Sequence, residues 1–427
     1  MDITTAAQEV LELLSSEGIA LSLHVGEAEA MLRDKMLEVA RTALQRHMDQ
    51  QALGYEGSSR ACGCGGSQRF VGHREKVLAT LVGPVRLRRA YYHCGDCGGS
   101  CFPYDQQTGL EACKVSPGLA KAAALAGIEV PFAQASKLLA ELSGIDLSES
   151  TISRMTQQAG QQADQIEQQQ AAAIREQNNP PEAPVAGRLY NSADGAMIHT
   201  LEKWQEVKTH VCYWTDAQGQ HHTRYRSRLE TVETFVGHAW ALAARWGLEN
   251  CRQSVLIGDG AAWIWERLGP IFDESIQIVD WFHAAEHLWA CGRALYPDVK
   301  GATSQACKDW IEPHKELLWN GQVRELLDAL AVELKRLRGK VKRAALESLM
   351  TYLVNQQARL DYRRFRDQGL QIGSGTVESA CRHVVQARLK RAGTRWKPVH
   401  AQAVLSLRTC RLNGEWETFW NSPSKAA

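Results

Sequence analysis

Two apolar runs, SVLIGDG at residues 254–260 and SIQIVD at residues 275–280, decide the fold class of this chain. Each reads as a buried strand of the parallel type, and each ends at an aspartate, Asp259 in the first and Asp280 in the second. Helix-forming sequence follows both runs, so the order is βαβα, which predicts an α/β fold with a partly parallel sheet. Acids at the carboxyl ends of such strands lie where α/β folds bind their ligands.

A third acid, Asp194, lies upstream in LYNSADGAMI at residues 189–198, which reads as a strand although aspartate is disfavoured in strands. Residues 207–214 follow as a further strand with alternating apolar side chains. A carboxylate in such a place is costly to desolvate unless it is paired or binds a cation. Helix N-capping is a sufficient reason for one such aspartate, whereas two glycine-flanked acids in one sheet favour metal binding.

The segment DWFHAAEHLW begins at Asp280 and places His283 and His287 one helical turn apart. That spacing lets two imidazoles share a zinc ion, with Asp280 or Glu286 as a third ligand, and would indicate a metallohydrolase. The aromatic residues around them are typical of a packed core. Three interpretations stay open: a zinc site, support of the Asp259 site by neighbouring side chains, and packing.

From residue 303 to residue 366 the sequence is nearly all helix-forming and basic, with no strand signal. We therefore expect an all-helical insertion in the α/β domain. GSGTVE at residues 373–378 then opens a helix that is expected to run through Ala392. Glu378 falls in its first turn, where an acid is favourable for the helix dipole whatever else it does.

Charge is segregated beyond this glutamate. Residues 379–414 contain eight Lys or Arg and no Asp or Glu. Because such a stretch repels itself, its presence in a chain of net charge +1 indicates contact with a polyanion. The residues expected to contact this polyanion are Arg382, Arg388, Lys390, Arg391, Arg395 and Lys397.

Five of the twelve cysteines crowd into the N-terminal part of the chain, in CGCGG at residues 62–66 and HCGDCGGSC at residues 93–101. Paired thiolates with intervening glycines and a β-rich spacer are typical of a tetrahedral zinc site, so we predict a zinc ribbon. The expected ligands are Cys62, Cys64, Cys94 and Cys97, with Cys101 or His93 as a substitute for one of them. Buried or redox-active thiols are the alternative.

The predicted ribbon also carries basic residues between aromatic ones, which suits either a phosphate-contacting surface or a solvated strand face. These are Arg69, Arg74, Lys76, Arg86, Arg88 and Arg89, beside Phe70, Tyr91 and Tyr92.

A second candidate for DNA recognition lies at residues 132–163. Residues 132–143 predict a helix that Gly144 ends, and Ser148 is a good N-cap for the next helix. This pattern resembles a helix-turn-helix, in which Arg154 and Gln157 would face DNA, although a generic helical hairpin fits it nearly as well.

Composition excludes several classes of protein. The chain has 427 residues, with 49 Lys and Arg against 48 Asp and Glu, so charge over the whole chain identifies no partner. The first twenty residues have four acids and no Lys or Arg, unlike a signal peptide, and no apolar run approaches the ~20 residues of a membrane span. We expect a cytoplasmic protein, associated with the nucleoid when bound to DNA, with reduced cysteines.

Together the motifs resemble the ISKra-type transposases of bacterial insertion sequences, and the likeness covers nearly the whole chain. It rests on CGCGG, YYHCGDCG, SADGAMI, VLIGDGAAWIW, IVDWFHAAEHLW and GSGTVESACRHVVQARLKRAGTRW. The resemblance implies a DDE transposase with an RNase H-like catalytic core and a helical insertion. The acidic triad of that family carries over to Asp194, Asp259 and Glu378, and the 118 residues between the last two accommodate the insertion.

What the resemblance implies about chemistry is two-metal phosphoryl transfer. The triad would hold two Mg²⁺ or Mn²⁺ ions per active site, with Asp280 and His283 supporting it, while the ribbon holds structural Zn²⁺. Expected partners are double-stranded DNA, as the terminal inverted repeats of the element and its target, and further copies of the chain in a homodimer or larger complex. The alternatives are a catalytically inactive or domesticated zinc-containing DNA-binding regulator and, more remotely, a zinc metallohydrolase.

The predicted domain organisation has a linker where NNPPEAP interrupts a Gln- and Ala-rich helix. The predicted parts are residues 1–55, a helical region; 56–110, the ribbon; 111–177, the helix-turn-helix region; 178–187, the linker; 188–300, the first part of the core; 301–370, the helical insertion; and 371–427, the final core helices with the basic stretch.

Overall fold

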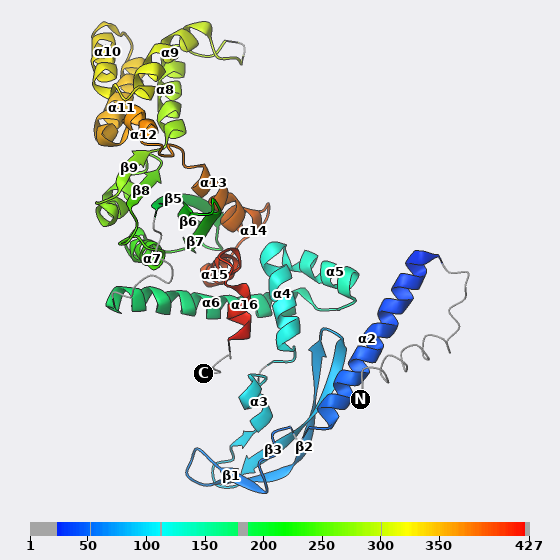
Figure 1. The fold of residues 1–427 in the computed structure, drawn as a ribbon. Coiled ribbons are helices and arrows are strands. Elements are labelled where there is room, and N and C mark those ends of the chain that lie inside the picture. Colours follow the sequence, from blue (N-terminus) through cyan, green and yellow to red (C-terminus); the bar gives the residue numbers. More distant parts are fainter. Residues whose placement is uncertain (1–23, 52, 112, 178–186, 300, 423–427) are drawn as a thin grey trace. The chain divides into compact units, whose positions relative to one another are not determined.

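The computed structural model describes residues 24–422 except 52, 112, 178–186 and 300, and it is a mixed α/β protein (Figure 1). Its contacts form two compact units, Met1–Thr156 with Trp420–Ala427 and Gln157–Phe419. The division therefore falls inside a helix rather than at the predicted linker, most of which lies outside the described residues.

The first unit is built on a four-stranded antiparallel sheet whose strands follow chain order. The strands are β1 Ser59–Ala61, β2 Ser67–Thr80, β3 Gly83–Cys94 and β4 Ser100–Cys101. Within the helical region predicted for residues 1–55 lies α2 Val25–Asp49, which runs along β3 (Figure 1). Gln45 fixes it there, because its side chain both donates to Arg86 O (2.8 Å) and accepts from Arg86 N (2.7 Å).

Four helices follow this sheet: α3 Pro103–Thr108, α4 Pro117–Glu129, α5 Phe132–Ser143 and α6 Glu149–Gln177. The predicted ends of α5 and α6 are confirmed. Gly144 takes the left-handed conformation (φ 70°) that stops α5, and the Ser148 hydroxyl accepts a hydrogen bond from Thr151 N (3.3 Å) at the start of α6. A buried cluster that includes Leu119 and Ile152 packs these helices together.

A five-stranded mixed sheet forms the centre of the second unit, with the order β7-β6-β5-β8-β9. Its strands are β5 Arg188–His199, β6 Trp204–Thr215, β7 His221–Arg228, β8 Gln253–Gly258 and β9 Ile276–Val279. The first three pair antiparallel, whereas β5, β8 and β9 run parallel, as the apolar runs predicted. The sequence did not predict β7, since its HHTRYRSR is too polar for a strand signal.

The described helices around this sheet divide into a covering set and an inserted set. The covering set comprises α7 Val232–Arg245, the π-helix η1 Ile264–Leu268 with the 3₁₀ turn η2 Gly269–Phe272, α13 Gly375–Ala380, the π-helix η4 Cys381–Gln386, α14 Ala387–Leu389, α15 Pro398–Leu412 and α16 Trp416–Asn421. The expected helix from residue 373 to 392 therefore exists, but a π-turn interrupts it and it ends at Leu389.

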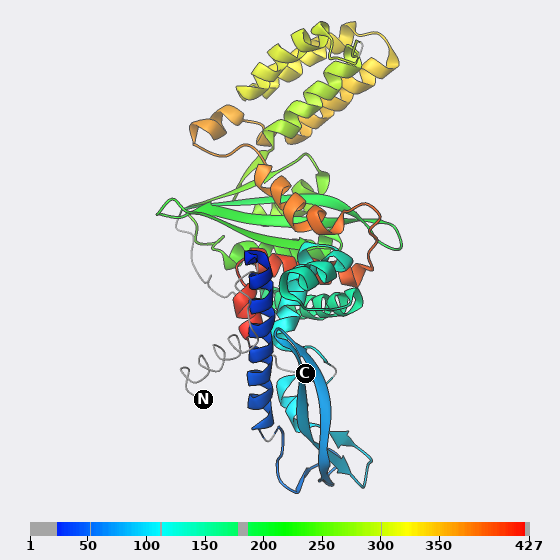
Figure 2. The ribbon, with the colours of Figure 1, turned by 90° about the vertical axis from the view of Figure 1, so that its right-hand side faces the viewer.

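The helical insertion, predicted for residues 301–370, begins earlier in the structure, directly after β9. It consists of α8 Trp281–Leu295, α9 Gln305–Trp319, α10 Val323–Arg336, α11 Lys340–Gln356, the 3₁₀ turn η3 Gln357–Arg359 and α12 Tyr362–Asp367. In Figure 2 the helices α8 to α11 extend side by side away from the sheet. The chain then returns to its point of departure, where Trp281 N donates to Ile372 O (2.9 Å).

The C-terminal part of α6 belongs to this second unit. Glu167 lies 2.9 Å from Arg226 on β7 and accepts a hydrogen bond from Thr409 on α15 (2.7 Å). At Gly160 a Cβ would lie 2.2 Å from the carbonyl oxygen of Ala403, so only glycine permits this approach of α6 to α15. These buried polar and close contacts explain why the contact boundary precedes the linker. Within the described part of the chain, no helix is long and apolar enough to cross a membrane.

Candidate metal centres

The acids Asp194, Asp259 and Asp280 lie near one another at one end of the parallel strands of the mixed sheet. Together with Glu378 they form what we call the acidic edge. Asp194 follows Ala193, whose register partner Gly258 is the last residue of β8, and Asp259 comes next along that strand. Asp280 follows β9, and its N–H donates to Gly258 O (2.8 Å). Because β5, β8 and β9 are parallel and β8 ends level with the middle of β5, the fold places Asp194 inside β5 near the acids that follow β8 and β9.

Asp280 is fully buried and its oxygens are occupied by hydrogen bonds. One oxygen accepts from Phe282 N (2.7 Å). The other accepts from the N–H (3.1 Å) and the hydroxyl of Ser374 and lies 3.3 Å from His283 Nδ1. Burial raises the pKa of this carboxyl, but the hydrogen bonds from His283 and Ser374 outweigh burial and hold the pKa below its usual value. This supports the prediction that Asp280 organises the site, because few of its lone pairs remain for a metal.

Glu378 reaches the same cluster from α13. Ser374 Oγ donates to a Glu378 oxygen (3.3 Å), and ligand atoms of Asp280, His283 and Glu378 all lie within 4.8 Å of one another. The hydrogen bond with Asp280 raises the pKa of His283 to about 9, although burial opposes this. His283 is therefore a cation at neutral pH, and it lies among carboxylates.

Asp194 and Asp259 form the other part of the acidic edge. Burial, joined by the charge of Asp259, raises the pKa of Asp194 above its usual value, although hydrogen bonds from Gly195 N (2.6 Å) and the Cys381 thiol act the other way. Asp259 accepts from Ala261 N (2.9 Å). Among the described residues, the group whose ligand atoms all lie within 4.8 Å of one another contains Asp280, His283 and Glu378, but neither Asp194 nor Asp259. The predicted triad is therefore at one edge, but its members are not drawn together.

The sequence interpretation missed two residues of this edge, Ser374 and Cys381. Ser374 is buried and bridges Asp280 to Glu378, and Cys381 interacts with Asp194 at the start of the π-helix η4. Ser374 belongs to the GSGTVE segment that predicted the start of a helix. Its position four residues before Glu378 could therefore have predicted a contact between the two side chains. Nothing in the sequence indicated Cys381, because a π-turn sets its direction.

His287 does not join His283. Its ring stacks on Tyr352 with a centroid distance of 3.8 Å, and burial lowers its pKa. The two imidazoles thus have different partners, which favours packing for His287 and support of the acidic edge for His283 over a shared zinc ion.

The cysteine cluster of the first unit has the shape of a zinc site. The sulfur atoms of Cys62 and Cys97 are 3.6 Å apart, those of Cys64 and Cys94 are 3.8 Å apart, and all four lie within 4.8 Å of one another. Zinc–sulfur bonds of ~2.3 Å in a tetrahedron place sulfur atoms about 3.8 Å apart. The backbone N–H groups of Cys97 and Asp96 lower the pKa of Cys94 to about 7, which favours the thiolate that a metal needs.

Two turns present these thiols. Gly65 N donates to Cys62 O (3.0 Å) and Gly98 N to Cys94 O (3.0 Å), with positive φ at both glycines (86° and 71°). The substitutes that the sequence allowed have other partners: His93 Nδ1 lies 3.0 Å from Ser100 Oγ, and the Cys101 thiol donates to Gln68 Oε1 (3.1 Å). The first four cysteines are therefore the coherent ligand set.

Most of the predicted DNA-facing cations are exposed, but one is not. The prediction that Arg388 meets phosphates is wrong for this conformation: only 1% of the residue is exposed, and its guanidinium lies over the Trp396 ring (4.9 Å). Trp396 O in turn accepts from Leu201 N between β5 and β6 (2.9 Å). The exposed residues are Arg154, Arg382, Lys390, Arg391, Arg395 and Lys397, while Gln157 is half-buried.

On the first sheet, two of the basic residues are used in folding. Lys76 Nζ lies 3.2 Å from Asp105, and Arg89, which also forms an ion pair with Asp105, lies over the Phe102 ring. These two therefore stabilise the fold rather than offering charge to a partner.

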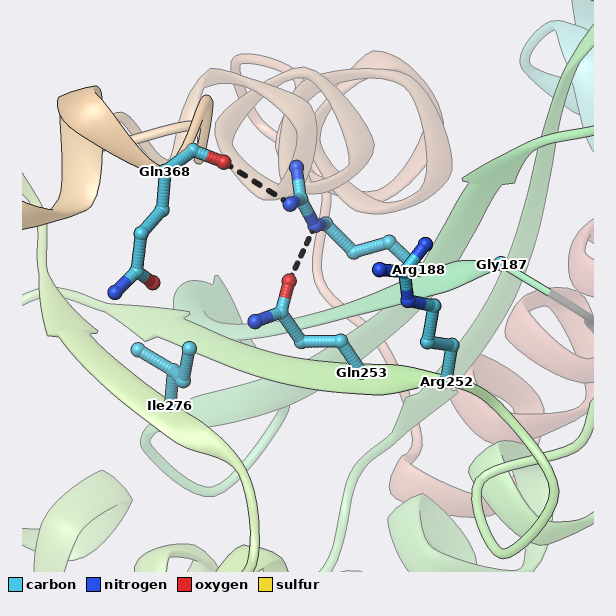
Figure 3. Close-up of a pocket in the computed structure, with 6 residues that line it drawn as sticks. All are labelled: Gly187, Arg188, Arg252, Gln253, Ile276 and Gln368. Atoms are coloured by element: carbon cyan, nitrogen blue, oxygen red, sulfur yellow. Dashed lines mark hydrogen bonds between the residues drawn. The ribbon is translucent and has the colours of Figure 1, made fainter.

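A cavity of about 540 Å³ lies at the opposite edge of the mixed sheet (Figure 3). It is lined where β5, β8 and β9 begin, and Arg188 there donates to Gln253 Oε1 (2.7 Å) and Gln368 O (3.1 Å). These bonds engage the guanidinium of Arg188. The cavity is separate from the candidate metal centre, because the acids lie toward the other ends of the parallel strands.

A model of the uncharacterised protein family UPF0236 matches residues 29–419, and the chain therefore belongs to this family. It is also similar to the "UPF0236 protein in vanSb 3'region" of Streptococcus gallolyticus, with 25% identity over 342 residues that cover 76% of this chain and 70% of that protein. The family match extends from α2 to α16, so it includes both the cysteine cluster and the acidic edge.

Proposed function

We propose that this UPF0236 member is a DNA transposase of an insertion sequence, of the ISKra-type that its motifs resemble. One observation carries the proposal: an acid inside β5 and the acids that directly follow β8 and β9 lie at the same end of the parallel strands as the helix acid Glu378, although an all-helical insertion separates Glu378 from them in the chain. We infer that the mixed sheet is an RNase H-like core and that Asp194, Asp259 and Glu378 are its catalytic acids.

The donor set suits hard divalent cations. Asp194, Asp259 and Glu378 offer carboxylate oxygens, which Mg²⁺ and Mn²⁺ prefer. Burial raises the pKa of Asp194, with a smaller contribution from the charge of Asp259, and a bound cation would favour its ionised form. When bound, the metal would activate a water or a DNA 3′-hydroxyl and stabilise the leaving oxygen.

The residues of the chain itself orient the site. Asp280 holds both the His283 ring and the N–H of Ser374, and Ser374 in turn contacts Glu378. Asp280 is therefore a positioning residue that fixes the start of α13 relative to β9. The His283 cation offsets part of the repulsion between the carboxylates.

Recognition of DNA is assigned to other surfaces. The four cysteines suit structural zinc in a ribbon, α5 and α6 suit a helix-turn-helix with Arg154 exposed, and the exposed cations after Glu378 suit DNA phosphates. We infer that a homodimer or larger complex binds the two ends of the element.

The test uses the full-length protein and a duplex that contains the DNA flanking its own gene, where inverted repeats are expected. The expected result is Mg²⁺- or Mn²⁺-dependent strand cleavage that leaves a 3′-hydroxyl, followed by strand transfer. Asp259→Asn should abolish cleavage, whereas Asp309→Asn, which alters an exposed acid on α9, should not. Cleavage by Asp259→Asn at the rate of the unaltered protein would overturn the proposal.

A further inference from the structure

The turn between α10 and α11 is the most concentrated basic surface outside the sites above. Residues 335–343 read KRLRGKVKR, with six cations and no acid. Four of them, Lys335, Arg336, Arg338 and Lys340, are exposed, and within the described part of the chain their side chains have no ion pair or hydrogen bond. We call these four residues the basic turn.

Folding accounts for the other two cations. Arg343 donates to Leu334 O (2.8 Å) and lies 3.5 Å from Glu347, and Lys342 Nζ is 5.8 Å from the Tyr296 ring centroid. These contacts tie α11 to α10 and to the end of α8.

Helix stability does not account for the rest of the charge. Cations at the end of α10 are favourable for its dipole, but α11 begins at Lys340 with three cations, no acid in its first turn and no side-chain cap at Gly339. Positive charge at a helix N-terminus is unfavourable. The cations in the first turn of α11 therefore oppose formation of this helix, and their presence points to a negatively charged partner.

The position of the basic turn relative to the acids is defined by α8. Asp280 is the N-cap of α8 and Tyr296 its C-cap, and the contact between Lys342 and Tyr296 places the basic turn at the far end of this helix. Figure 2 shows α8 to α11 running side by side over this length. A helix of 15 residues is about 22 Å long, which is about six to seven base pairs of duplex.

We propose that the basic turn binds phosphates of duplex DNA about six to seven base pairs from the phosphate that reacts at the acidic edge. The inference rests on the proposed function, since it takes DNA at the acids as given. Duplex DNA fits better than an acidic protein surface, because two of the four residues are lysines, which protein interfaces are depleted of, whereas both Lys and Arg commonly contact phosphates.

The test measures the affinity of the full-length protein for a 40-base-pair duplex of arbitrary sequence over a salt series. Changing all four residues of the basic turn to Gln should lower the magnitude of the slope of log affinity against log salt by up to ~3.6, at ~0.9 per phosphate contact. The pair Arg338→Gln and Lys340→Gln should lower it by up to ~1.8. The matched pair Lys315→Gln and Arg324→Gln, at the other end of the helical insertion, should leave it unchanged. Equal thermal unfolding temperatures exclude misfolding.

The result also separates this inference from the proposed function. A slope that the fourfold variant retains would overturn the inference while leaving cleavage at the acidic edge intact, and the turn would then suit an acidic protein surface. Loss of slope in the fourfold variant, in a protein that cleaves no DNA with any divalent metal, would support the basic turn as a DNA surface but reject the catalytic assignment.

Discussion

The two candidate metal centres differ in how completely the polypeptide assembles them. The cysteine cluster comes from two turns of neighbouring strands, and all four sulfur atoms already have the spacing of a zinc site. The acidic edge draws on β5, β8, β9 and α13, and Asp194 and Asp259 stay outside the group formed by Asp280, His283 and Glu378.

Charge explains the difference. A protonated thiol is neutral, so four cysteines approach one another without repulsion before a metal binds. Carboxylates at neutral pH repel one another. Burial, joined by the charge of Asp259, raises the pKa of Asp194, and the His283 cation lies beside Asp280. Neutral thiols can therefore lie at ligand spacing before a metal binds, whereas a cluster of carboxylates is expected to need its cation to close.

The largest expected effect concerns the complete site. Cys97→Ser should release about one zinc ion per chain and unfold much of the first unit, because zinc binding energies of ~10–16 kcal/mol equal or exceed the stability of a whole domain. Zinc content measured by atomic emission, together with thermal unfolding, checks this. Cys101→Ser is the control, since its thiol bonds to Gln68. Unchanged zinc content in the Cys97 variant would mean that the four cysteines do not form a zinc site.

The next effect concerns the acidic edge. Asp194→Ala, Asp259→Ala and Glu378→Gln should each reduce Mg²⁺-dependent cleavage and strand transfer to background while end binding persists, because each removes a carboxylate from metal-dependent chemistry. Cleavage assays and gel shifts on the same DNA measure both properties. If Glu378→Gln remained fully active, the third ligand would have to be sought elsewhere, with Asp280 as the first candidate despite its occupied oxygens.

A smaller effect is expected from the cations that follow the acidic edge. Changing Lys390, Arg391, Arg395 and Lys397 to Gln should lower the salt slope of duplex binding by up to ~3.6, for specific and arbitrary sequences alike. Arg388→Gln should leave the slope unchanged and lower the unfolding temperature, because this guanidinium is packed over Trp396. A lower slope for the Arg388 variant would mean that this buried arginine becomes exposed when DNA binds.

The smallest expected effect is the pH dependence of stability that comes from His283. Because the pKa of His283 is raised to about 9 in the folded chain, its contribution to stability is present below pH ~6.5 and is lost as the pH rises through 9. In metal-free protein we expect a loss of about 1–2 kcal/mol, reduced from the value for a fully buried pair because the imidazole is partly exposed. Unfolding by denaturant at pH 6 and pH 9.5 measures it, with His283→Asn as reference. An equal loss in both proteins would assign the pH dependence to other groups.

Sequence patterns predicted much of this molecule because they act locally. Apolar runs predicted the parallel strands, and the absence of strand signals predicted the helical insertion. Gly144 predicted the end of α5 and Ser148 the start of α6. Prediction failed for β7, whose polar residues are paired with α6 and α15. Contacts of these elements also hold the C-terminal part of α6 to the second unit.

By itself the sequence determined the types of ligand and the elements that carry them: thiols in two turns, acids at strand ends and a glutamate in the first turn of a helix. Only the tertiary structure decided which groups meet. It paired Glu378 with Asp280 and His283 through Ser374, turned His287 toward Tyr352, and buried Arg388 in a row of otherwise exposed cations. The physical reason is that propensity and periodicity act over a few residues, whereas burial and hydrogen bonding of a charged group depend on segments that the fold brings from far along the chain.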